Sequence, residues 1–140
     1  MYYVLFMRIQ SLKHSTYQHP YHVVWGTKYR MRFLKPDAVQ MELSASFYQS
    51  ASEHPEIYML AAKSDLDHVH VQVEIAPSMA VATAVQILRA NASAALKKRF
   101  AFVGRMYPGG GIWSVGYFSS TNGLNEEVIR RYVENQGRRD

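Results

Sequence analysis

The sequence contains no cysteine among its 140 residues. A disulfide framework and a thiolate-bound metal are therefore both excluded, and any metal must be held by histidine and oxygen ligands. Such ligands favour Mg²⁺ or Mn²⁺ over a structural zinc, although histidine by itself does not exclude zinc.

Long apolar segments are also absent. The short apolar run at the N-terminus is interrupted by Arg8, and no cleavage site of small residues follows it. No stretch approaches the roughly 20 apolar residues that a membrane-spanning helix requires. We therefore expect a cytoplasmic protein that has no membrane partner.

Internal repeats and low-complexity tracts are missing, and the length suits one domain spanning residues 1–140. A hydrophobic content of 48% and an aromatic content of 13% argue against disorder. Sixteen Lys and Arg residues against eleven Asp and Glu residues give a net charge of +5. This charge suits a polyanionic partner such as nucleic acid, although many basic proteins bind no nucleic acid.

The glycine-rich stretch at 104–111 contains Pro108 and three successive glycines, so we expect it to be a loop. It matches neither a Walker motif nor a dinucleotide-binding pattern. The sequence therefore gives this loop no nucleotide-binding role.

The stretch from Asp65 to Ile75 has the clearest pattern in the chain. From His68 onward it alternates as a strand does, with Val69, Val71, Val73 and Ile75 on one face and His68, His70, Gln72 and Glu74 on the other. Side chains two residues apart emerge roughly 6.6 to 7 Å apart, a span that two imidazoles can close around one cation. On its own, such a pair is more often a surface feature than a catalytic site.

The other segments predict an α+β fold. We expect strands at 21–29, 57–62 and 112–120, and helices that begin at Pro36, at Ser78 as N-cap and at Asn125 as N-cap, ending near Ser52, Arg99 and Gln136. With the histidine strand, the first six elements form a ferredoxin-like β-α-β-β-α-β palm with two helices on one face of an antiparallel sheet. Residues 1–20 form an N-terminal extension, and 121–140 add a C-terminal helix.

The final helix offers candidate partners for the histidines. Tyr132 and Gln136 are four residues apart and share a helix face, beside an apolar stripe of Val128, Ile129 and Val133 that would dock the helix. The chain has ten tyrosines, most of which must be packing residues. Tyr132 is distinguished by its position at the border of the docking stripe.

Four motifs in this order resemble a known family. They are Tyr21-His-Val-Val-Trp-Gly-Thr-Lys-Tyr-Arg30, Asp67-His-Val-His70, Trp113-Ser-Val-Gly-Tyr-Phe118, and Tyr132 followed by Gln136. Together they are similar to the single-tyrosine HUH transposases of the smallest bacterial insertion sequences, the TnpA group. The resemblance runs from about Tyr21 to Gln136, nearly the whole chain.

The resemblance implies a role for each matching residue. His68 and His70 would bind a divalent metal, Mg or Mn, with Gln136 as the third ligand, and Tyr132 would be the nucleophile. The implied reaction cleaves single-stranded DNA and leaves a 5′-phosphotyrosine link and a free 3′-OH. The resemblance also implies a bacterial or archaeal protein associated with the nucleoid, hairpin DNA near the element's ends, and a homodimer in which the tyrosine helix of one subunit serves the histidines of the other. The 119–125 linker, which contains Gly123, is a candidate hinge for this exchange.

Several alternatives remain open. The chain could be a domesticated HUH nuclease acting on chromosomal repeat palindromes, or a non-catalytic ferredoxin-like module that binds nucleic acid. Asp67 either orients His68 or simply belongs to the turn, and we favour the turn. Gln72 ranks below Gln136 as a site residue, and Glu74 lies too far along the strand to share the metal. The remaining histidines, His14, His19, His22 and His54, show no comparable arrangement.

Overall fold

The computed structural model describes residues 20–121 and 126–139. The elements in chain order are β1 (Tyr21–Gly26), the 3₁₀ turn η1 (Lys28–Arg30), α2 (Asp37–Glu53), β2 (Ile57–Asp65), β3 (His68–Ile75), α3 (Val81–Arg99), α4 (Ala101–Met106), β4 (Phe118–Ser120) and α5 (Glu126–Arg139).

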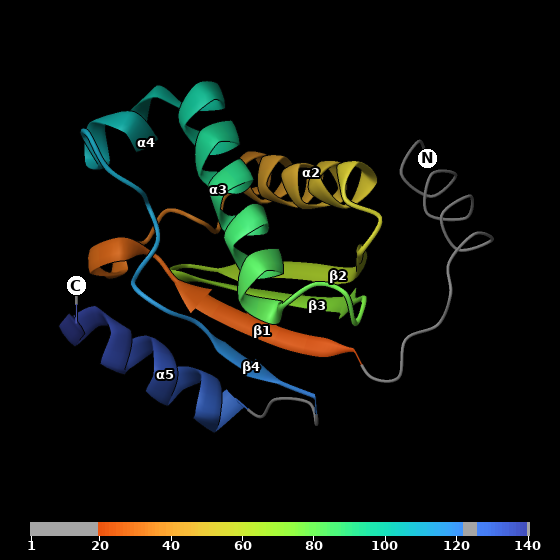
Figure 1. Ribbon diagram of the computed structural model, residues 1–140. Coiled ribbons are helices and arrows are strands. Elements are labelled where there is room, and N and C mark those ends of the chain that lie inside the picture. Colours follow the sequence, from red (N-terminus) through yellow and green to blue (C-terminus); the bar gives the residue numbers. More distant parts are fainter. Residues whose placement is uncertain (1–19, 122–125, 140) are drawn as a thin grey trace.

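The four strands form one antiparallel sheet in the order β2-β3-β1-β4. Helices α2 and α3 cover one face, and α5 lies against the opposite face (Figure 1). This is the predicted α+β, ferredoxin-like arrangement, with β1 and β3 as the central strands and an added C-terminal helix.

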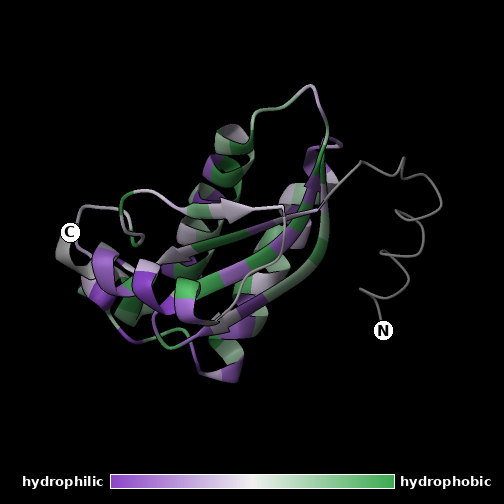
Figure 2. Ribbon diagram, turned by 90° about the horizontal axis from the view of Figure 1, so that it is seen from below, coloured by the Kyte–Doolittle hydropathy of each residue, from purple (hydrophilic) through white to green (hydrophobic). Residues whose placement is uncertain are grey.

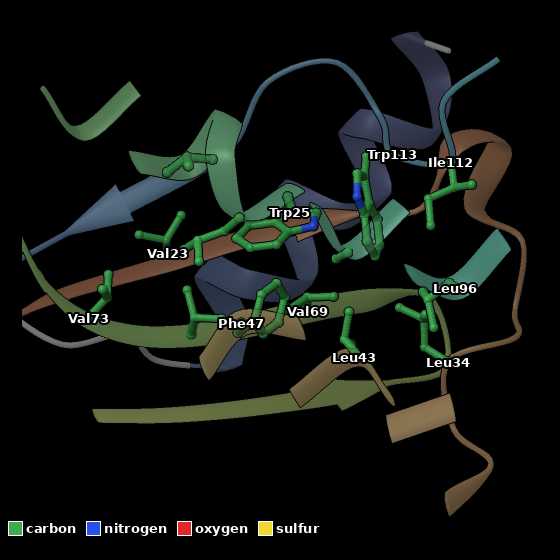
Figure 3. Close-up of a cluster of buried hydrophobic side chains, with 14 of the residues drawn as sticks. Val23, Trp25, Leu34, Leu43, Phe47, Val69, Val73, Leu96, Ile112 and Trp113 are labelled. Carbon is green, nitrogen blue, oxygen red and sulfur yellow. The ribbon is translucent and has the colours of Figure 1, made fainter. Parts of the chain in front are cut away.

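The core lies between the sheet and the helices α2 and α3. The valines of β3 at positions 69, 71 and 73 are fully buried, so the predicted alternation is confirmed. Trp25 of β1 packs edge-on against Phe47 of α2 and Trp113, with ring centroids 5.8 and 5.9 Å away (Figure 3). These aromatic contacts hold β1 and α2 together and fix the sheet beneath α5.

The first strand is shorter than predicted. It ends at Gly26, and the chain turns because the backbone N–H of Thr27 donates to Asp67 O at 2.9 Å and that of Lys28 donates to Ile112 O at 2.8 Å. Tyr29 therefore lies outside the strand, with φ 60° and 58% of its surface exposed. The predicted strand at 21–29 was therefore three residues too long.

The region between α3 and β4 differs most from the prediction. Gly104 lies inside the short helix α4, so the glycine-rich loop begins only after Met106. Of the predicted strand at 112–120, only Phe118–Ser120 pairs as a strand, while Trp113 makes a single bridge to Thr27. Gly116, with φ 81°, turns the chain between the two.

The helix boundaries mostly agree with the pattern. Helix α2 ends one residue beyond Ser52, and α3 ends at Arg99 with its basic last turn as expected. Ser78 was wrongly predicted as the N-cap of α3, because Ala80 occupies that position and makes no side-chain capping bond. The predictions for residues 1–19 and for Asn125 lie outside the described residues.

Helix α5 consists largely of hydrophilic residues, as Figure 2 shows. Within residues 20–121 and 126–139, no helix is both long and apolar enough to cross a membrane.

Candidate active site

His68 and His70 lie on the face of the sheet that carries α5. His68 is opposite Gly26 of β1 and His70 is opposite Val24, so both imidazoles stand over the two central strands. Each is partly buried, and the valines between them point to the other face. The alternation of β3 therefore gives the two histidines one common side, as predicted.

His68 is held by a chain of polar contacts. Its Nδ1 lies 3.2 Å from Oδ1 of Asp67, and Arg30 donates from Nε to Oδ2 of the same carboxylate at 3.3 Å. The hydrogen bond from His68 and the nearby Arg30 charge hold the pKa of Asp67 below its ordinary value, although burial opposes them. Asp67 therefore belongs to the turn and also contacts His68, whereas sequence reasoning favoured the turn alone.

His22 of β1 is a site neighbour that sequence reasoning missed. Its ring centroid lies 5.7 Å from that of His70. The buried Nδ1 of His22 and the buried Nε2 of His70 have no hydrogen-bond partner among the described residues. The signal was present in the sequence, because alternation along β1 turns His22 away from the buried Val23 and Trp25 and toward the histidine face.

Burial is the main reason why the pKa of His70 lies below its ordinary value, and the nearby His22 and Lys63 lower it further. A neutral imidazole is the form that can bind a metal. The environment of His70 therefore favours a ligand-competent ring at neutral pH.

Helix α5 carries Tyr132 onto the same face of the sheet. Tyr132 packs against Phe118 of β4 with ring centroids 6.1 Å apart, and the neighbouring Val133 is only 4% exposed. Helix α5 also contacts β1 and η1 of its own chain. The prediction that an apolar stripe docks this helix is thus confirmed at Val133.

Gln136 lies one turn beyond Tyr132 in α5, but its side chain is not among those that the structure describes. Its role as third metal ligand therefore stays a prediction. Among the side chains that are described, no group of three or more His, Asp or Glu residues could hold a metal ion. His70 fits a divalent cation, because its buried Nε2 has no partner among the described residues and so suits a ligand role. His68 lies two residues earlier on the same face of the sheet.

A pocket of about 530 Å³ opens beside His68, between α5 and the turn that joins β2 to β3. Its lining is almost entirely charged and comprises Arg30, Asp65, Asp67, His68, Glu127, Arg130, Val133 and Glu134. Charges of both signs can accommodate a cation together with an anionic group such as a phosphate. Neither Tyr132 nor His70 lines this pocket.

Comparison with known proteins places this chain in a family. The family model described as "Transposase IS200 like" matches residues 15–136. The transposase for insertion sequence element IS200 of Salmonella typhimurium is 28% identical over 127 residues, which cover 91% of this chain and 82% of that protein. A candidate transposase from Deinococcus radiodurans has a crystal structure with a TM-score of 0.73 and 25% identity, covering 87% of this chain and 93% of that one.

A REP-associated tyrosine transposase bound to a REP hairpin has a TM-score of 0.50 at 11% identity, over 86% of this chain and 69% of that one, which shows a shared fold alone. The family model matches residues 15–136, a range that includes β1 and β3, the two strands under the histidines, and reaches Gln136. The chain therefore belongs to the IS200-like transposase family.

Proposed function

We propose that this transposase cleaves and rejoins single-stranded DNA at the ends of an insertion sequence, with Tyr132 as nucleophile and a divalent metal, Mg²⁺ or Mn²⁺, held by His68, His70 and Gln136. The observation that carries the proposal is that α5 brings Tyr132 onto the sheet face that bears both histidines. The family membership and the net charge of +5 support a DNA substrate.

The chemistry needs a strongly polarised phosphate. A tyrosine with a pKa near 10 is only about 0.1% ionised at pH 7, so its hydroxyl is a weak nucleophile. A metal held by the histidines supplies Lewis-acid stabilisation of the phosphate charge. The hydroxyl of Tyr132 loses its proton, and its oxygen forms the bond to phosphorus while the bond from phosphorus to the 3′ oxygen breaks.

The products conserve the energy of the broken bond. The 3′ oxygen leaves and takes up a proton to become a free 3′-OH, and the 5′ phosphate stays on Tyr132 as a phosphodiester. Attack on that phosphotyrosine by another 3′-OH rejoins DNA and restores the tyrosine hydroxyl. Strand transfer therefore requires no ATP.

A covalent-adduct assay tests this proposal. The protein is incubated with single-stranded DNA that carries a candidate hairpin and element end, together with Mn²⁺ or Mg²⁺, and a protein-DNA adduct is measured. Tyr132→Phe should lower adduct formation by about 10³-fold or more while hairpin binding is retained. Cleavage should be lost in the same way in His68→Ala, in His70→Ala and in the presence of EDTA. If Tyr132→Phe still forms the adduct, Tyr132 is not the nucleophile.

The proposed homodimer shares its active sites between subunits. In the structure α5 contacts β1 and η1 of its own chain, so sharing of active sites requires α5 to pack on the other subunit instead. Mixed dimers distinguish the two arrangements. Tyr132→Phe subunits mixed with His68→Ala subunits regain one intact site if tyrosine and histidines come from different subunits, and they stay inactive if each site forms within one chain.

A further inference from the structure

A strained turn lies directly beside His68. Tyr29 and Arg30 have φ values of 60° and 53°, and within the described residues they are the only non-glycine positions with positive φ. Consecutive residues rarely adopt this conformation unless the surrounding structure holds them there. The turn is held by the Thr27 N–H bond to Asp67 O at 2.9 Å and by the hydroxyl of Tyr107, which donates to Lys28 O at 2.8 Å.

The strained turn at Tyr29 and Arg30 points the Arg30 side chain toward Asp67. The guanidinium Nε donates to Oδ2 of Asp67 at 3.3 Å, and the carboxylate is only 7% exposed. Its other oxygen, Oδ1, meets Nδ1 of His68 at 3.2 Å. One carboxylate thus joins the strained turn to the first histidine of the pair.

The donor and acceptor chemistry of these contacts fixes the tautomer of His68. An ionised carboxylate can only accept hydrogen bonds, so Nδ1 of His68 must carry the hydrogen. In a neutral imidazole the lone pair then lies on Nε2. Metal-binding histidines commonly donate their other N–H to a carboxylate in this way, which orients the ring and raises its basicity.

We propose that Arg30 and Asp67 are positioning residues that fix the tautomer and ring orientation of His68, presenting its Nε2 lone pair to a divalent cation. The metal part of this inference rests on the proposed function. The tautomer is a property of the metal-free chain and can be measured separately.

Asp65 provides a matched control. It lines the same pocket as Asp67 and carries the same charge, but its Oδ1 accepts the backbone N–H of Leu66 at 2.8 Å and lies 3.8 Å from Nζ of Lys35. Asp65→Ala therefore removes one negative charge from the pocket and leaves the Asp67 contact with His68 in place.

The first experiment measures the tautomer. Metal-free protein labelled with ¹⁵N-histidine is examined by long-range ¹H–¹⁵N NMR at a pH where the rings are neutral, and His68 is assigned with His68→Gln. The wild type and Asp65→Ala should show a hydrogen on Nδ1, whereas Asp67→Ala should shift His68 toward the Nε2–H form. An unchanged His68 tautomer in Asp67→Ala would overturn the proposal.

The second experiment measures Mn²⁺ affinity from the electron paramagnetic resonance signal of free Mn²⁺. Asp67→Ala should bind Mn²⁺ about 10- to 100-fold more weakly than the wild type, as expected when the partner of a metal-binding histidine is removed. Asp65→Ala should change the affinity much less. An equal loss in both variants would overturn the proposal, because pocket charge and not orientation would then explain the effect.

Arg30→Met gives a second variant should Asp67→Ala fail to fold, because the Arg30 side chain is 42% exposed and Met keeps much of its aliphatic stem. It should shift the His68 tautomer in the same direction as Asp67→Ala and weaken Mn²⁺ binding by a smaller factor. If the tautomer and the Mn²⁺ affinity both stay unchanged, Arg30 does not have the proposed role. The His68 tautomer could change in Asp67→Ala while the wild-type chain binds no Mn²⁺. That result would support the role of Asp67 in orienting His68 and would reject the proposed metal.

Discussion

The imidazole rings of His22 and His70 lie 5.7 Å apart on adjacent strands. In the β1–β3 register, His22 is opposite Gln72 and His70 is opposite Val24, so the two rings are diagonal neighbours on the face that α5 covers. Both rings have a buried nitrogen without a partner among the described residues. Burial and the proximity of a second imidazole both disfavour the charged form of His70.

This relationship predicts the titration of His70 in the metal-free protein. We expect its pKa to lie below about 6.5 and to rise in His22→Phe, which keeps an aromatic ring but removes a group that can carry charge. The rise should be partial, because burial is the larger cause of the shift. NMR titration of the histidine rings measures the effect, with His54→Gln at the end of α2 as control. A His70 pKa that is unaffected by His22→Phe would contradict it.

The same shift predicts how stability depends on pH. His70 binds a proton less readily in the folded state than in the unfolded state, so the unfolded state gains more protons as the pH falls below about 6.5. The free energy of unfolding should therefore decrease from pH 7.5 toward pH 5. Urea denaturation across this range should show a shallower decrease for His70→Gln. A steeper decrease in that variant would mean that the sign is wrong.

The contact of Phe118 with Tyr132 predicts a positioning role for Phe118. Removing its ring in Phe118→Ala should leave Tyr132 less well ordered, and small misplacements of a reacting group lower rates by roughly 10- to 100-fold. The rate of covalent adduct formation measures this, while hairpin affinity should change little. Phe118→Tyr, which keeps the ring, should retain most of the rate. Equal rates for Phe118→Ala and the wild type would show that the contact does not position the nucleophile.

The sequence was most informative where side-chain periodicity and burial agree. The alternation from His68 to Val73 and the i, i+4 pattern from Val39 to Ala51 both match the observed burial, because only one register buries the apolar face. Glu74 departs from the alternation, since it is only 8% exposed. The element order then allowed the antiparallel palm to be predicted. The apolar residues from Ile112 to Phe118 led to the wrong prediction of a continuous strand. Part of this segment is buried in an irregular conformation, in which the Arg89 side chain donates hydrogen bonds to Ser114 O and Gly116 O.

The candidate site was less accessible to sequence reasoning, because its contacts join residues far apart in the chain. Arg30 and Asp67 are 37 residues apart, and their contact depends on a left-handed turn at non-glycine residues that no local preference predicts. His22 needed the strand order before its proximity to His70 could be inferred. The roles of Tyr132, His68, His70 and Gln136 remain predictions.

The aromatic contact between the sheet and α2 predicts a large effect on stability. Phe47 is fully buried and meets Trp25 edge-on at 85°. Phe47→Ala should lower the free energy of unfolding by about 3–5 kcal/mol, because it removes apolar contacts and leaves a cavity. Phe47→Leu should cost less, about 1–2 kcal/mol. Urea denaturation monitored by tryptophan fluorescence measures both, and equal losses would show that the ring shape does not matter.

The basic residues on opposite sides of the sheet predict which face meets DNA. The side chain of Arg131 on α5 is 72% exposed, and Lys98 is exposed near the end of α3, a helix that covers the opposite face of the sheet from α5. If single-stranded DNA runs over the histidine face, Arg131→Ala should weaken binding and lower the slope of log affinity against log salt by about 0.7, the value for one lost phosphate contact. Lys98→Ala removes the same charge and should leave the slope unchanged. Fluorescence anisotropy with a labelled single-stranded oligonucleotide at several salt concentrations separates the two variants, and a larger slope change for Lys98→Ala would place the DNA against α2 and α3.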